Sequence, residues 1–191
     1  EIPHQLHGVA PVKAEANEIT EKRFSKNMSD IIIDKDIIIS SDLTYLVDDA
    51  EVLVIAIPSQ FLNSFFIELK EVIKDNQHIC IASKGLDETN IDFFSNTLNK
   101  LNMDKNLCFI SGPTFAHEMA LKYPMGLSLA SKNKNSIDII TKCFENTNVN
   151  LIPTDDIIGL QFLGTVKNVL AILFGIAEGA NYSISAKSCL I

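Results

Sequence analysis

Lysines and a glycine-containing turn interrupt apolar stretches at three places, and these residue types could bind and protonate a small phosphorylated substrate. Lys84 lies in Ala82-Ser-Lys-Gly85, and Lys167 lies in a nearly apolar segment, residues 157–177. Between the two lysines, Gly112-Pro-Thr114 follows another apolar run. A phosphate pairs with ammonium groups through charge-assisted hydrogen bonds, and a lysine shielded from water can exchange its proton near neutral pH. The three places together predict a site for one phosphate group and one proton transfer.

Lys167 has two interpretations. It is surrounded in sequence by Leu, Ile, Val, Phe, Ala and Gly. Burying an ammonium group there is costly unless it is paired, and desolvation would lower its pKa towards the range useful for proton transfer. Alternatively, the side chain reaches solvent from an outward-facing stripe of the helix. The pattern alone does not decide between these two interpretations.

Lys84 and Gly112 each follow a segment typical of a buried strand, which places them where α/β sheets bind ligands, at the carboxyl ends of the strands. Gly112 permits close backbone approach, and exposed amides at the following helix start attract anions. An ordinary loop lysine and an ordinary strand-to-helix turn are the alternatives. Phe61, after Pro58-Ser59, either packs on a ligand or is a core aromatic at a helix start. His117 has no partner at a meaningful spacing, and we interpret it as a polar helix residue.

Short apolar segments alternate with amphipathic ones from about residue 42 onward, which predicts an α/β fold with right-handed crossovers and a parallel sheet. We expect a Rossmann-like, doubly wound sheet whose strands are buried on both faces. Either Ser41 or Asp42 would cap the first helix. The expected strands are residues 51–57, 78–82, 107–110, 125–130 and 149–152, and the expected helices are residues 42–49, 60–74, 91–101, 137–144 and 157–177.

The last of these helices is long and apolar enough to raise the question of a membrane span. Gln161, Lys167 and Asn168 argue against one, because a lysine near a bilayer centre costs about 2.5–3.5 kcal/mol on insertion scales. We therefore expect no membrane span and a buried helix that crosses between two domains.

The composition of the chain excludes some classes of function. The chain has 191 residues, 47% of them hydrophobic, and a net charge of −8. Such a chain can bury a core, and it lacks the clusters of Lys and Arg that nucleic-acid binding requires. Its four cysteines show no metal-ligand spacing, so we expect no metal site and a reduced, cytoplasmic protein. No basic segment followed by an apolar one, typical of a secretory signal, follows Glu1.

Three sequence blocks resemble a known family. Ala82-Ser-Lys-Gly85, Ile110-Ser-Gly-Pro-Thr-Phe-Ala-His-Glu118 and Gly164-Thr-Val-Lys-Asn168 are similar to segments of the bacterial NAD(P)-dependent glycerol-3-phosphate dehydrogenases. The resemblance runs from about Glu18 to Ile191. It implies Lys167 as general acid/base, Lys84, Gly112, Thr114 and Asn168 at the substrate, and Lys84, Ala116 and Phe61 at the cofactor.

The resemblance also implies a reaction, the reduction of dihydroxyacetone phosphate to sn-glycerol 3-phosphate with NAD or NADP as cofactor, for phospholipid synthesis. A homodimer is the expected assembly. The family's first βαβ unit, with its glycine-rich turn, has no counterpart here, since no GxGxxG or GxGxxA occurs. We therefore expect the central portion of a family chain, truncated at both ends and inactive in this form. The expected parts are a poorly ordered head, residues 1–17, a partial dinucleotide-binding domain, residues 18–153, and the start of a helical substrate domain, residues 154–191.

Two alternatives to this function stay open. One is another β-hydroxyacid-type dehydrogenase with the same two-domain plan, although those relatives carry different sequence blocks. The other is a non-catalytic remnant or an oligomerisation partner, which the missing glycine-rich turn favours.

Overall fold

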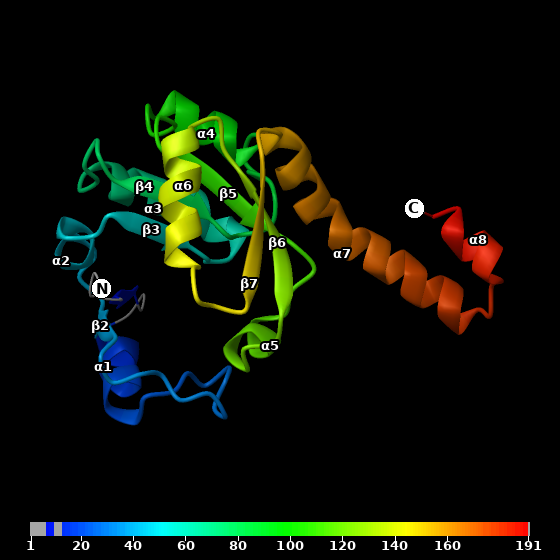
Figure 1. Cartoon of the computed structure of the whole chain (residues 1–191), viewed down its shortest axis with the longest axis horizontal. Helices are drawn as coiled ribbons and strands as arrows, with labels where there is room; N and C mark the ends of the chain where they lie inside the picture. Colours follow the sequence, from blue (N-terminus) through cyan, green and yellow to red (C-terminus); the bar gives the residue numbers. More distant parts are fainter. Residues whose placement is uncertain (1–6, 10–12, 191) are drawn as a thin grey trace.

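The computed structural model of the chain describes residues 7–9 and 13–190, and a five-stranded sheet forms its centre (Figure 1). The strands lie in the order β3-β4-β5-β6-β7. Helices connect them and cover both faces, as expected for an α/β fold. The strands are β3 (Val52–Ile55), β4 (His78–Ile81), β5 (Leu107–Ser111), β6 (Met125–Ala130) and β7 (Val149–Thr154). From residue 43 to the last strand, the helices are α2 (Leu43–Asp48), the 3-10 turn η1 (Ser59–Phe61), α3 (Leu62–Lys70), α4 (Phe94–Lys100), α5 (Ala116–Ala120) and α6 (Lys134–Cys143).

The sheet is mixed, which corrects the expectation of a wholly parallel one. β3, β4 and β5 run parallel, β6 pairs antiparallel with β5, and β7 is parallel to β6. A parallel partner for β5 would require a crossover over one face of the sheet. The five-residue helix α5 instead lies beyond the end of β6 (Figure 1), so the chain turns back at that end.

Burial along the strands follows their place in the sheet. All four residues of β4 are buried, and so are Leu107 to Ile110 of β5, as the apolar runs predicted. The same expectation is wrong for β3, where Val54 is 56% exposed. β3 forms an edge of the five-stranded sheet, so its outward face is covered less completely.

Two apolar clusters hold the helices to the sheet. Phe66 of α3 and Phe94 of α4 are buried together, with ring centroids 6.0 Å apart in an edge-to-face arrangement, a favourable geometry for aromatic pairs. Ile140 of α6 packs on the other cluster, with Cys80 and Cys108. Burial raises the pKa of both thiols, which fits inert core cysteines.

A small βαβ unit precedes the main sheet: β1 (His7–Val9), α1 (Lys13–Lys22) and β2 (Ile38–Ser40), with β1 and β2 parallel. The expected poorly ordered head is therefore wrong for residues 7–9 and 13–17, and α1 spans the expected boundary at residue 18. The rest of the head, residues 1–6 and 10–12, lies outside the described residues. The sequence between β1 and α1 contains no glycine.

Helix α2 begins as predicted. The Asp42 carboxylate accepts a hydrogen bond from the backbone N–H of Tyr45, which caps the helix.

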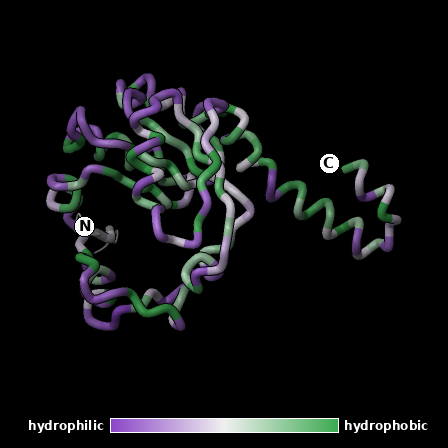
Figure 2. The backbone as a smooth tube through the Cα atoms, viewed as in Figure 1, coloured by the Kyte–Doolittle hydropathy of each residue, from purple (hydrophilic) through white to green (hydrophobic). Residues whose placement is uncertain are grey.

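The last strand leads into the long helix α7 (Ile157–Gly179), which projects away from the sheet and ends near α8 (Ile184–Ser188) (Figure 1). Figure 2 shows that α7 is hydrophobic along most of its length. The expectation of a buried helix is wrong, because only Gln161, Gly164 and Ala177 are buried. By length and composition alone, α7 is the one candidate membrane span among the described residues, and core helices of soluble proteins pass the same test. Its exposed large apolar side chains are Ile158, Phe162, Leu163, Val169, Ile172, Leu173 and Ile176.

Candidate active site

The turn after β4 presents Lys84 at the carboxyl end of the sheet. The Ser83 hydroxyl donates to the carbonyl oxygens of Ile57, at 2.5 Å, and Ile55, at 3.3 Å, which fixes the backbone before Lys84. Gly85 has a φ of +137°, and a Cβ there would lie 2.7 Å from the Cβ of Ser59. Only glycine meets both the backbone conformation and the close approach. The lysine is therefore held between two fixed residues.

The turn after β5 meets the turn after β4 through Lys84. The Lys84 Nζ donates to the carbonyl oxygen of Gly112 at 3.2 Å. Gly112 itself packs closely on β6, since a Cβ there would lie 2.8 Å from the carbonyl oxygen of Gly126 and 3.3 Å from the Cα of Leu127. Sequence reasoning predicted both residues for one site, and the structure brings them together.

Helix α7 brings Lys167 to the same end of the sheet. The Lys167 Nζ lies 5.6 Å from the centre of the Phe115 ring, within the range of a cation–π interaction. Gly164, one turn earlier, allows the close approach, because a Cβ there would lie 3.1 Å from the Ser111 Oγ and 3.9 Å from the Lys84 Cγ. Lys167 is half-buried, intermediate between the two interpretations that its sequence left open.

The two lysines create a concentration of positive charge. Burial, and then the nearby charge of Lys167, lower the pKa of the Lys84 ammonium group. Two neighbouring cations repel each other, and an anion placed between them relieves that repulsion. The arrangement suits a phosphate, with one ammonium group free to exchange a proton. Among the described residues, no cluster of His, Cys, Asp and Glu could hold a metal ion.

A small cavity of about 10 Å³ lies beside Lys84 and Gly164. It has room for about one water molecule. Its lining includes Lys84, Gly85, Ser111, Gln161 and Gly164. A larger cavity of about 350 Å³ lies between the end of α5 and the segment joining α6 to β7, and it contains none of the predicted site residues.

The other predicted site residues lie near this end of the sheet without a direct contact to the lysines among the interactions described. Phe61, in η1, is 52% exposed, so the alternative of a core aromatic is wrong. Thr114 is half-buried, and its N–H donates to the Gly112 carbonyl oxygen at 3.0 Å. Ala116 begins α5, and Asn168 is exposed on α7. The ligand contacts assigned to these four residues stay predictions.

His117 has a partner that its sequence surroundings did not indicate. Its Nε2 lies 2.6 Å from an Asp30 carboxylate oxygen, and both side chains are exposed. This contact joins α5 to the segment between α1 and β2, which agrees with the interpretation of His117 as a polar helix residue.

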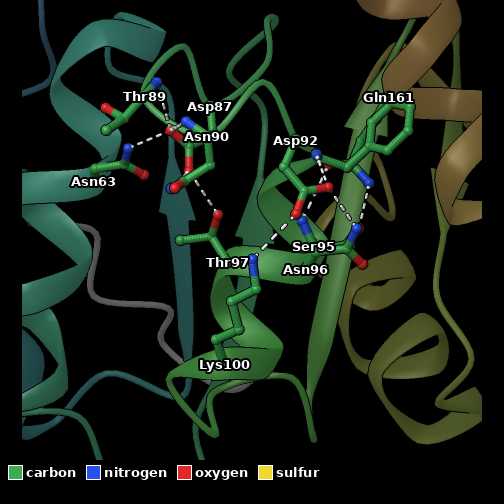
Figure 3. Close-up of polar contacts among 11 residues, drawn as sticks. Asn63, Asp87, Thr89, Asn90, Asp92, Ser95, Asn96, Thr97, Lys100 and Gln161 are labelled. Atoms are coloured by element: carbon green, nitrogen blue, oxygen red, sulfur yellow. Dashed lines mark hydrogen bonds and ion pairs between the residues drawn. The ribbon is translucent and has the colours of Figure 1, made fainter.

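Two further polar residues near the site were missed by the sequence reasoning. Asp87, three residues after Lys84, is buried in a hydrogen-bond network, and Gln161 of α7 contacts Ser95 of α4 (Figure 3). Asp87 precedes Glu88-Thr89-Asn90, a composition typical of a side-chain-stabilised turn, and that was the available signal. Gln161 was noted only as a polar residue that argues against a membrane span.

The fold and the site define a class of protein: a Rossmann-like α/β protein that gathers two lysines at the carboxyl ends of its parallel strands, an arrangement suited to an anionic ligand. Comparison with known families is more specific. The model described as NAD-dependent glycerol-3-phosphate dehydrogenase N-terminus matches residues 4–137, and the model of the corresponding C-terminus matches residues 156–191. The chain belongs to the NAD-dependent glycerol-3-phosphate dehydrogenase family.

Curated relatives carry the same name. A glycerol-3-phosphate dehydrogenase [NAD(P)+] of Fusobacterium nucleatum is 32% identical over 94% of this chain and 54% of its own length. One from Legionella pneumophila is 35% identical over 82% of this chain and 47% of its own length. The chain thus spans about half the length of the curated relatives it matches.

Solved structures show the same fold. The glycerol-3-phosphate dehydrogenase of Coxiella burnetii superposes with a TM-score of 0.83 at 22% identity, over 97% of this chain and 57% of that one. The Plasmodium falciparum enzyme gives a TM-score of 0.86 at 20% identity, over 98% of this chain and 54% of that one.

Proposed function

We propose that this chain carries the catalytic centre of an NAD(P)-dependent glycerol-3-phosphate dehydrogenase, which reduces dihydroxyacetone phosphate to sn-glycerol 3-phosphate. The observation that supports this most is the convergence of Lys84, Gly112 and Lys167 at one end of the sheet in a member of this family. The family membership argues against the alternative of another β-hydroxyacid-type dehydrogenase.

The residues present fit the reacting end of a nicotinamide cofactor. Phe61 exposes an aromatic face at the end of β3, and Ala116 is a small exposed residue at the start of α5. Phe61, Ala116 and Lys84 would hold the nicotinamide, which supplies the hydride when bound. The sequence contains no GxGxxG turn for the pyrophosphate.

The chain's own contribution is binding, orientation and proton delivery. Lys84, with Gly112 and Thr114, would hold the substrate so that its carbonyl oxygen faces the Lys167 Nζ. Lys167 would donate a proton to that oxygen as the carbonyl carbon accepts hydride, so the carbonyl becomes a hydroxyl group. Asn168, the next residue on α7, would orient the same oxygen. In the oxidative direction, the neutral amine of Lys167 would take the proton back.

Because the chain is expected to be inactive in this form, the test measures binding of NADH and NADPH and their dihydroxyacetone phosphate-dependent oxidation by the chain and by a longer family protein that contains it. Each is compared with its Lys167→Ala variant. Loss of the proton donor should lower kcat by about 10²–10⁴-fold. Lys134→Ala is the matched control, because Lys134 is exposed on α6 and pairs only locally with Asp138.

A wild-type chain that is folded yet shows no turnover and no binding of either dinucleotide would overturn the proposal. That outcome would favour the alternative of a non-catalytic protein. We also propose that the protein acts in the cytoplasm on a soluble small molecule, while the homodimer stays a prediction.

A further inference from the structure

A buried carboxylate anchors the turn that carries Lys84. Asp87 is 1% exposed, and its two oxygens accept five hydrogen bonds (Figure 3). The donors are the Asn63 Nδ2 at 2.6 Å, the Asn90 Nδ2 at 2.7 Å, the Thr89 N–H at 3.0 Å, the Thr97 Oγ1 at 3.1 Å and the Asn90 N–H at 3.3 Å. A buried carboxylate with this many donors is fully compensated.

The donors of this network come from different elements. Asn63 belongs to α3, Thr97 belongs to α4, and the others lie in the turn itself. The orientation of Asn63 that makes this bond has a free-energy cost, because the Asn63 Oδ1 is buried without a partner among the described residues. Although burial alone would raise it, the pKa of Asp87 falls to about 2 because Asn90, Asn63 and Thr97 donate to the carboxylate. The charged carboxylate therefore ties the Lys84 turn to both helices at neutral pH.

The hydrogen bonds to Asp87 form one polar joint at α4, and a second polar joint connects α4 to α7. The Gln161 Oε1 accepts from the Ser95 N–H at 3.2 Å, and the Gln161 Nε2 donates to the Ser95 Oγ at 2.9 Å and to the Ile157 carbonyl oxygen at 3.1 Å. Gln161 is only 7% exposed. Figure 3 shows the pair facing each other between the two helices. Both polar ends of the Gln161 amide are thus satisfied, which fixes its position.

The two joints lie on opposite sides of one short helix. Thr97 of α4 contacts Asp87, and Ser95 of the same helix contacts Gln161. Lys84 precedes Asp87 by three residues, and Lys167 follows Gln161 by six, about 9 Å along a helix axis. One helix therefore connects the supports of both lysines.

Specific hydrogen bonds add direction to the other contacts of α7, which are apolar packing and the close approach of Gly164 to Ser111. Ile157 and Leu160 pack on the apolar core, and apolar contacts are non-directional. The positive charges of Lys84 and Lys167 repel each other. Beyond Gly164, Ala177 is the only residue of α7 that is buried. The Gln161–Ser95 bonds are the directional contacts between α7 and α4, so losing them should loosen the position of α7 and with it the distance between Lys167 and Lys84.

We infer that α4 is a bracket that sets the spacing of Lys84 and Lys167, with Asp87, Thr97, Ser95 and Gln161 as positioning residues. The claim that this spacing serves catalysis rests on the proposed function, whereas the claim that α4 sets the spacing does not. The four residues touch neither lysine through their side chains in the contacts described, and they act through the backbone of the turn and of α7.

The experiment breaks the α4–α7 joint and leaves α4 intact. Gln161→Met keeps a similar side-chain volume and removes all three hydrogen bonds, and Ser95→Ala removes one by a smaller change. Gln161→Glu is a partial rescue: its carboxylate accepts from both the Ser95 N–H and the Ser95 hydroxyl, but it cannot replace the amide N–H that donates to the Ile157 carbonyl oxygen. Asn96→Ala is the matched control, since Asn96 is the neighbouring residue and donates only to Asp92.

Two readouts separate the spacing from the activity. The first is the yield of the Lys84–Lys167 cross-link formed by a short bifunctional amine-reactive reagent, measured by peptide mass spectrometry. The second is kcat/KM for dihydroxyacetone phosphate. We expect Gln161→Met to lower the cross-link yield severalfold and kcat/KM by about tenfold or more, since misplacements of about 1 Å are costly in catalysis. Asn96→Ala should stay close to wild type in both, and Gln161→Glu should lie between wild type and Gln161→Met.

A folded Gln161→Met variant with wild-type cross-link yield would overturn the bracket. If Gln161→Met fails to fold, judged by circular dichroism, Ser95→Ala decides the outcome. If the folded wild-type chain shows no turnover and binds neither dinucleotide, the proposed function fails, while a cross-link yield that falls in Gln161→Met and recovers in part in Gln161→Glu still establishes the bracket.

Discussion

The two turns that form the site differ in how completely hydrogen bonds within the chain fix their conformation. The turn after β4 is fixed by Ser83, by the positive-φ backbone of Gly85 and by the five hydrogen bonds to Asp87. In the turn after β5, the contact described within the turn is the Thr114 N–H to the Gly112 carbonyl oxygen. Phe115 of that turn is 67% exposed.

This difference separates two ways of building a binding site. Hydrogen bonds within the chain preorganise the β4 turn, so a ligand loses little free energy in ordering it. The β5 turn depends on its close packing against β6 and exposes Phe115 and Ala116, so ligand contacts would complete its order. Lys84 joins the two turns through the Gly112 carbonyl oxygen. Changes to the groups that anchor the β4 turn should therefore appear in stability, whereas changes to Lys84 and to the β5 turn should appear mainly in catalysis.

Removing Lys84 should produce the largest effect. Lys84→Met deletes the hydrogen bond between the turns and one phosphate-binding charge, and we expect kcat/KM to fall by about 10²–10³-fold. Stability should stay equal or rise. The folded-state pKa of Lys84 is lowered by burial and by Lys167, so folding disfavours the charged form at neutral pH. This penalty begins to fall as pH passes the folded-state pKa and is gone above the ordinary value of 10.5.

The measurement combines steady-state kinetics with thermal unfolding at pH 7, and Lys70→Met, an exposed substitution on α3, is the control. A marked fall in the unfolding temperature of Lys84→Met would show that the lysine is a structural residue of the turn.

Gly112→Ala tests the β5 turn through its packing. The added Cβ would lie 2.8 Å from the Gly126 carbonyl oxygen, so the turn must move away from β6 and take the Lys84 contact with it. We expect a loss of kcat/KM of about tenfold to 10²-fold and a stability cost of about 1–3 kcal/mol. Gly126→Ala is the control, because a Cβ there meets no atom within 4 Å. Equal effects of the two substitutions would refute this account of Gly112.

The sequence predicted those parts of the fold and site that depend on local chemistry. The buried runs of β4 and β5, the Asp42 cap, and the positions of Lys84 and Gly112 after their strands all follow from residues near one another. Lys84 and Gly112 could be placed together because parallel strands share one carboxyl edge.

The parts that could not be predicted depend on partners far away in sequence. Gln161 and Ser95 are 66 residues apart, and Asn63 and Asp87 are 24 apart, so no local pattern indicates either pair. The apolar composition of α7 predicted the helix correctly and its burial wrongly, because burial depends on what packs against a helix. The antiparallel pairing of β6 follows from the path taken through α5, which hydrophobic periodicity does not record.

Asp87→Asn tests the β4 turn through stability. The carboxylate has a pKa of about 2 in the folded chain, against an ordinary value of 3.8. A lowered folded-state pKa contributes stability that is fully present above about pH 4 and is lost as pH falls towards 2. We expect the variant to lose about 2 kcal/mol of unfolding free energy at pH 7, and the difference from wild type should shrink between pH 4 and pH 2.

Urea unfolding at several pH values measures this effect. Asp138→Asn, which removes one partner of an exposed i,i+4 ion pair on α6, should change stability by less than about 0.5 kcal/mol. A difference between Asp87→Asn and wild type that stays constant down to pH 2 would mean that the carboxylate charge is not what anchors the turn.

The smallest expected effect concerns the exposed aromatic of the β5 turn. Phe115 lies under the Lys167 ammonium group at 5.6 Å, and cation–π interactions at exposed sites contribute about 0.5–1 kcal/mol. Phe115→Leu keeps an apolar side chain and removes the ring, so kcat should fall by about two- to fivefold, with little change in stability because the side chain is largely exposed. Phe115→Tyr, which keeps the ring, should retain wild-type kcat and thereby distinguish the ring from the bulk of the side chain. If Phe115→Leu and Phe115→Tyr behave alike, the ring does not hold Lys167, and the β5 turn contributes to the site through the Gly112 carbonyl oxygen alone.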